Sequence, residues 1–102
     1  MIYPFKHPYS YSKSIVEGWN SSAIGVYYCG YVGSDGKLYI FYIGKGTSDG
    51  GMRKRLLDHI REDYWPDVTH FGYHECDTIK EAEDHEAVEI NLYKPKYNKI
   101  GK

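Results

Sequence analysis

The chain is 102 residues long, the size of one domain. Its formal net charge of −1 argues against the overall basic surface that is typical of nucleic-acid-binding proteins. The sequence shows no apolar stretch of transmembrane length, no signal-peptide pattern, and only two cysteines, Cys29 and Cys76, which form neither a disulfide framework nor a paired-cysteine zinc pattern. We therefore expect a protein of the reducing cytoplasm with no membrane partner.

The charges are unevenly distributed along the chain. Residues 45–61 carry five basic side chains against two acids, residues 62–93 carry ten acids and one lysine, and residues 94–102 carry four lysines and no acid. Two basic stretches can still form a surface that follows phosphates, although segregated charges are also common on solvated helices. Tyrosine occurs twelve times and phenylalanine three times. Tyrosine suits partly wet clefts as well as the rim of a small core.

Residues 1–23 contain Pro4, Pro8 and several serines and tyrosines, so we predict an irregular aromatic arm. The arm is expected to pack over the core, with contact to a partner or to DNA as the alternative. Residues 24–102 form the predicted folded domain. Its first part contains two runs rich in β-formers, 23–32 and 38–43, around a turn with an Asp-Gly pair, which predicts a β-hairpin.

A glycine-rich loop, 44–51, follows the hairpin and leads into a helix expected to run from Gly51 to about Asp63. Met52, Leu56 and Ile60 give this helix one inward stripe at steps of four residues. Val68–Cys76 alternates like a strand.

Thr78 and Glu81 then form a capping box that opens a second helix, which ends near Tyr93 because Pro95 follows. The order β-β-α-β-α predicts an α/β (α+β) fold with a small, mainly antiparallel three-stranded sheet flanked by helices.

The second helix has one acid in its predicted inward stripe. That stripe consists of Ile79, Ala82, Glu86, Ile90 and Tyr93. An unpaired buried carboxylate is very costly, so a metal ion or a basic residue has to meet Glu86, unless a small rotation of the helix places it at the rim.

Arg55 and His59, four residues apart, flank the stripe of the first helix and are expected to face the edge of the sheet. An arginine there can grip a phosphate with two hydrogen bonds, pair with Glu86, or lay its long stem along an apolar surface.

Five short motifs together resemble the GIY-YIG nuclease family, including its excision-repair and homing-endonuclease members. They are Gly25-Val26-Tyr27, Tyr42-Ile43-Gly44, Arg55-x-x-x-His59, Glu86-x-x-x-Ile90 and the stretch Tyr93-Lys-Pro-Lys-Tyr-Asn98. The resemblance covers about residues 24–99. The hairpin turn and the loop from Gly44 to Arg55 are longer than is usual in the family, which puts the loop's DNA contacts in question more than the chemistry.

The resemblance implies a metal-dependent endonuclease that hydrolyses phosphodiester bonds in DNA, with branched or damaged DNA among the candidate substrates. Glu86 would hold a single Mg²⁺ or Mn²⁺, Tyr27 or Tyr42 would be the general base, with Tyr27 favoured, and Arg55 would neutralise a phosphate oxygen. Asn98 would orient the phosphate or a tyrosine hydroxyl, and His59 would relay or position a proton. The residues expected to contact DNA are Lys45, Arg53, Lys54, Arg61 and Lys96. The protein would act as a monomer or a homodimer.

Three alternatives remain open from the sequence. One is a non-catalytic nucleic-acid-binding or interaction module on the same fold, and another is a nuclease that cleaves RNA. The third is a zinc-stabilised module that uses His70, His74 and Cys76, with His59 or His85 as the fourth ligand. The sequence does not choose between nicking and double-strand cleavage, or between roles in repair, mobile elements, phage and restriction.

Overall fold

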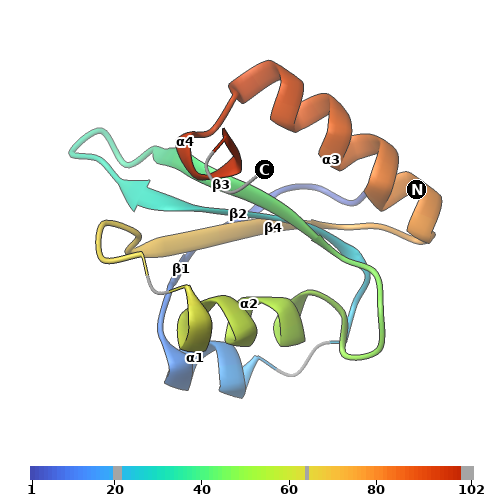
Figure 1. Cartoon of the computed structure of the whole chain (residues 1–102), viewed down its shortest axis with the longest axis horizontal. Helices are drawn as coiled ribbons and strands as arrows, with labels where there is room; N and C mark the ends of the chain where they lie inside the picture. The colour runs from blue at the N-terminus through green and yellow to red at the C-terminus, as the bar shows by residue number, and fades with distance from the viewer. Residues whose placement is uncertain (20–21, 64, 100–102) are drawn as a thin grey trace.

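The computed structural model describes residues 1–19, 22–63 and 65–99. Its elements, in chain order, are β1 (Lys6–Ser10), α1 (Lys13–Gly18), β2 (Gly25–Val32), β3 (Leu38–Gly46), α2 (Gly51–Glu62), β4 (His70–Glu75), α3 (Ile79–Tyr93) and α4 (Lys96–Lys99). The strands form one antiparallel sheet in the order β1-β4-β2-β3. Helices α1 and α2 cover one face of the sheet, and α3 and α4 cover the other (Figure 1).

The predicted hairpin is confirmed as β2 and β3, which pair from end to end except at a bulge, where Phe41 lies between the partners of Cys29 and Gly30. Their turn contains Gly36 with φ of 80°, a left-handed conformation that glycine adopts without steric cost. Strand β3 runs on to Gly46, past the end of the apolar run, because Lys45 and Gly46 continue the pairing with Val26 and Gly25.

The prediction of an irregular N-terminal arm was wrong, and so was the count of three strands. Residues 6–10 form β1, which pairs with β4 and adds a fourth strand at the edge of the sheet. All five residues of β1 are exposed, so the segment shows none of the alternation that would reveal a strand in the sequence. Helix α1 follows, and its Val16 is fully buried in the core.

The sheet separates two apolar clusters, because successive side chains of β2 point to opposite faces. Tyr27 and Cys29 face α2, and Val26 and Tyr28 belong to the cluster beneath α3. The predicted stripe of α2 is confirmed: Met52 and Leu56 are fully buried, and Ile60 packs against the same cluster.

Helix α3 begins with the predicted capping box, in which the Thr78 hydroxyl accepts from the Glu81 amide and the Glu81 carboxylate accepts from the Thr78 amide. Its predicted inward stripe was wrong at both ends, because Ile79 is 46% exposed and Tyr93 is 52% exposed. The contact with the sheet is made by the middle of the helix. None of the helices in the described part of the chain is long and apolar enough to cross a membrane.

Candidate active site

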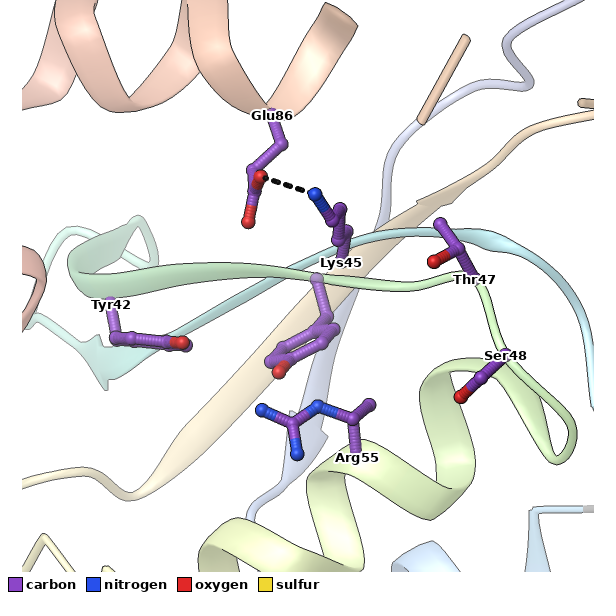
Figure 2. A pocket seen from close by; sticks show the side chains of 7 residues that line it. Tyr42, Lys45, Thr47, Ser48, Arg55 and Glu86 are labelled. Carbon is purple, nitrogen blue, oxygen red and sulfur yellow. Dashed lines mark ion pairs between the residues drawn. The ribbon is translucent and has the colours of Figure 1, made fainter. Parts of the chain in front are cut away.

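A polar cleft with a volume of about 360 Å³ opens at the edge strand β3, between α2 on one face of the sheet and α3 on the other. The side chains that line it are Tyr27, Tyr42, Lys45, Thr47, Ser48, Arg55 and Glu86. Arg55 enters from α2 and Glu86 from α3, on opposite sides of β3 (Figure 2). Four residues that the sequence selected as catalytic candidates, Tyr27, Tyr42, Arg55 and Glu86, therefore line the same cleft.

The register of β2 and β3 places the two tyrosines. Tyr27 lies opposite Gly44 and Tyr42 lies opposite Cys29, so both rings project from the α2 face with their centroids 6.2 Å apart. Gly44 is required there, because a Cβ at this position would lie 2.4 Å from the Tyr27 hydroxyl. The glycine of the second strand motif thus makes room for the tyrosine of the first.

A chain of hydrogen bonds leads away from Tyr27. Its hydroxyl lies 2.8 Å from Nε2 of His59, and Nδ1 of His59 lies 2.5 Å from a carboxylate oxygen of Asp63. A carboxylate only accepts, so Nδ1 carries a proton. Burial lowers the pKa of His59 against the opposing effect of Asp63, so the ring is neutral at neutral pH and its contact with Asp63 is a hydrogen bond rather than an ion pair. Nε2 therefore accepts the proton of the Tyr27 hydroxyl.

Both cleft tyrosines are protonated at neutral pH. Burial raises the pKa of Tyr27 well above its ordinary value, and burial also raises the pKa of Tyr42. The nearby Arg55 guanidinium acts in the opposite direction on both but does not overcome the burial. A tyrosine in this cleft can accept a proton from water only if its own proton leaves at the same time, and Tyr27 has the acceptor for it in His59.

Arg55 is partly exposed, and its Nη1 lies 3.6 Å from Asp58. Asp58 also pairs with Lys54 at 3.4 Å and with Arg61 at 2.9 Å. Burial works to raise the pKa of Asp58, but Lys54 and Arg61 bring it below the ordinary value. The positive charge of α2 is therefore partly neutralised by Asp58, an acid of the same helix.

The remaining predicted DNA contacts lie outside the cleft. Arg53 donates to the backbone carbonyl of Glu17 in α1 at 2.8 Å. Lys96 pairs with Asp67 at 2.6 Å and lies over the Phe41 ring. Of the five residues expected to contact DNA, Lys45 is the one that lines the cleft.

Glu86 meets a basic residue. The Lys45 ammonium lies 3.7 Å from its carboxylate (Figure 2), and Lys45 also lies 3.8 Å from Glu83. The Glu86 side chain is 20% exposed, so it stands at the rim of the cleft rather than in the core. Together with the hydroxyls of Thr47 and Ser48, this carboxylate gives the cleft the oxygen donors that Mg²⁺ prefers. The donor set fits a divalent ion that keeps several of its waters.

Asn98 has a different place from the one expected. It is buried, its Oδ1 accepts from the Ile43 amide at 2.8 Å, and its Nδ2 donates to the Ile43 carbonyl at 2.8 Å. Both ends of its amide are thus used on the backbone next to Tyr42, and Asn98 does not line the cleft. Its contacts make it a positioning residue that fixes β3.

Thr47 and Ser48, which line the cleft, were not selected from the sequence, and neither were two residues beside it, Asp63 and Trp65. Asp63 follows His59 by four residues, a helical spacing at which side chains meet, so it could have been found. The Trp65 ring stacks on Tyr97 at 5.2 Å and packs against Tyr42 and His59 at 4.9 and 5.0 Å. Trp65 lies in a loop, where no periodicity indicates the direction of a side chain.

The zinc ligands considered from the sequence do not come together as a set. His70 bonds the hydroxyl of Thr69, and Cys76 is buried in the apolar cluster beneath α3. Within the described residues, the ligand atoms that gather belong instead to His74, His85 and Glu89.

No protein-family model, curated protein or solved structure matches this chain. The functional assignment therefore depends on the motifs of the sequence and on the residues that the fold brings into the cleft.

Proposed function

We propose that this chain is a metal-dependent endonuclease of the GIY-YIG type that hydrolyses phosphodiester bonds in DNA. One observation carries the proposal: Tyr27, Tyr42, Arg55 and Glu86, each taken from a different motif, line a single cleft. They come from four different secondary-structure elements, so sequence proximity does not account for their meeting.

The cleft has the groups that a phosphodiester needs. Arg55 can donate two parallel hydrogen bonds to non-bridging phosphate oxygens and offset the charge that grows on them in the transition state. Lys45 adds a second positive charge, and the Thr47 and Ser48 hydroxyls add donors on the loop side. This small basic cluster binds the scissile phosphate, whereas the more distant cations of α2 are partly neutralised by Asp58.

Water activation is assigned to Tyr27. As the water attacks, Tyr27 takes its proton and passes its own hydroxyl proton to Nε2 of His59. Asp63 stabilises the imidazolium that results. The Tyr27 side chain has no exposed surface, so contact with the water requires a shift of the cleft wall when the substrate binds. Tyr42, which is partly exposed, positions the water and the phosphate.

Glu86 would hold a single Mg²⁺ or Mn²⁺, because it is the carboxylate among the lining residues of the cleft. When bound, such an ion stabilises the developing charge on the phosphate and on the leaving oxygen. The Lys45 ammonium lies 3.7 Å from the Glu86 carboxylate, so Lys45 and the proposed ion would be attracted to the same negative charge. DNA is the proposed partner, and the protein would act as a monomer or a homodimer. Both cysteines are free and buried, in keeping with the proposed cytoplasmic location.

The test is nicking of supercoiled plasmid by the full chain in Mg²⁺, with and without EDTA. Arg55→Ala should slow nicking by about 10²- to 10³-fold, the usual effect of losing one preorganised charge donor. Arg53→Ala is the matched control on the same helix, because Arg53 bonds the Glu17 carbonyl outside the cleft, and its rate should stay near wild type.

DNA binding without EDTA-sensitive cleavage would replace this proposal with a non-catalytic binding module. A structured RNA assayed in parallel shows whether the protein prefers to cleave DNA or RNA. Preferential RNA cleavage would overturn the DNA assignment.

A further inference from the structure

On the α3 face of the sheet, and outside the cleft, three potential metal ligands gather. His74 comes from β4, and His85 and Glu89 come from successive turns of α3. One ligand atom from each lies within 4.8 Å of the others. His85 Nε2 and Glu89 Oε1 are already 3.5 Å apart. Two ligands of a tetrahedral zinc ion lie about 3.4 Å apart, given bonds of about 2.0–2.1 Å.

The hydrogen bonding of His74 leaves one ring nitrogen suited to a metal. Its Nδ1 lies 2.8 Å from the backbone carbonyl of Tyr3. A carbonyl only accepts, so Nδ1 carries the proton and Nε2 has the lone pair. A backbone carbonyl that holds the other nitrogen of the ring is the usual outer support of a metal-binding histidine. The Phe5 ring packs on His74 at 5.0 Å and restricts its movement.

Glu89 is also held in place by a residue that is not one of the three ligands. The Tyr28 hydroxyl donates to Glu89 Oε1 at 2.7 Å and lies 3.2 Å from His85 Nε2. The side chains of His85 and Glu89 are 23% and 15% exposed, so they are largely dehydrated but still reachable from solvent. Because Tyr28 gives its proton to Glu89, it accepts from His85 Nε2, so a bound ion would replace the Nε2 proton while Tyr28 stays bonded to the carboxylate.

A metal ion bound at this position would strengthen the attachment of α3 to the sheet. Ala82 is the buried residue described for this helix and Ile90 packs against the same cluster, while Val88 and Leu92 are 62% and 67% exposed. The apolar contact that holds α3 on the sheet is therefore small. An ion shared by His74 and the helix residues would fasten α3 to β4.

We propose that His74, His85 and Glu89 form a transition-metal site, suited best to Zn²⁺, that fastens α3 to the sheet. Two imidazoles and one carboxylate are a ligand set that zinc accepts, with water in the fourth position. The site uses none of the cleft residues and is independent of the proposed nuclease function.

The first experiment is calorimetric titration of the EDTA-treated and dialysed full chain, without an affinity tag, with ZnCl₂. With excess Mg²⁺ present to occupy the cleft, one Zn²⁺ should bind per chain, and Zn²⁺ should raise Tm. His85→Gln and Glu89→Gln should each lose both effects. His70→Gln is the matched control, because His70 lies on the same strand as His74 but bonds Thr69, and it should bind zinc like the wild type.

Glu83→Gln should also bind zinc normally, because Glu83 lies on the same helix but belongs neither to the ligand set nor to the cleft lining. If a ligand variant does not fold, histidine ¹⁵N spectra of the wild type replace it, and Zn²⁺ should shift His74 and His85 while leaving His70 unchanged. Absence of one-to-one binding would overturn the proposal. So would wild-type affinity in both His85→Gln and Glu89→Gln, or loss of binding in Cys76→Ser with those two unaffected.

Discussion

The hydroxyl of Tyr27 and Nε2 of His59 lie 2.8 Å apart beneath the cleft, joining the first strand motif to the helical one. On the far side of the ring, Asp63 fixes the proton on Nδ1. The arrangement has the order of a proton relay: cleft, tyrosine, imidazole, carboxylate. It gives His59, the residue whose role was least defined by the sequence, a specific partner on each side.

Tyr27→Phe should lower the nicking rate by about 10²- to 10⁴-fold, the usual cost of losing a general base. It should also destabilise the fold by about 1–3 kcal/mol, because Nε2 of His59 is left buried without a donor. Single-turnover nicking and urea unfolding measure the two effects. Tyr42→Phe is the comparison, and a larger rate loss in that variant would make Tyr42 the base.

Stability should depend on pH through His59. Burial holds its pKa in the folded state below 6.5, so the unfolded chain binds more protons once the pH falls below that value. The contribution of the neutral ring is fully present above pH 6.5 and is lost as the pH falls through the lowered pKa. Arg55 favours the neutral ring, and Asp63 and Asp58 oppose it.

Urea unfolding at about pH 7.5 and about pH 5.5 tests this linkage. The wild type should lose more unfolding free energy over that interval than His59→Gln, in which the titrating group is absent. An equal loss in the two proteins would show that His59 does not carry the dependence.

Glu86 and Glu83 form a matched pair for the metal assignment. Both lie within 4.0 Å of Lys45, but Glu86 lines the cleft and is 20% exposed, whereas Glu83 is 51% exposed and lies outside it. Glu86→Gln should reduce Mg²⁺-dependent nicking by more than about 10²-fold with Tm unchanged, since a metal contributes several kcal/mol of charge stabilisation. Glu83→Gln removes the same charge and should keep the rate and the Mg²⁺ dependence of the wild type. Similar rates in the two variants would remove the metal role from Glu86.

Asn98→Ala should act through stability. It leaves the buried N–H and C=O of Ile43 without partners, at a cost of about 1–3 kcal/mol for each. Thermal unfolding should show a lower Tm, and nicking should recover when it is assayed well below that temperature. Persistent inactivity in the fully folded variant would instead place Asn98 in direct contact with substrate.

Features set by neighbouring residues were predictable. The turn before Lys37, the capping box of Thr78 and Glu81, and the stripe of Met52 and Leu56 depend on interactions a few residues apart, and the structure confirms all three. The N-terminal strand depends on pairing with β4, some sixty residues away, and its exposed side chains leave no pattern. Its backbone gains partners only once the sheet exists.

The candidate site likewise has features that the sequence predicts and features that depend on the tertiary structure. The motifs of the sequence alone selected Tyr27, Tyr42, Arg55 and Glu86 as candidate catalytic side chains. Only the tertiary structure decided what each one meets. It bonded Tyr27 to His59 and placed Lys45 beside Glu86, and it turned Asn98 onto the backbone of Ile43. Hydrogen bonds and ion pairs act over a few ångströms, so these partners exist only where the sheet brings distant segments together.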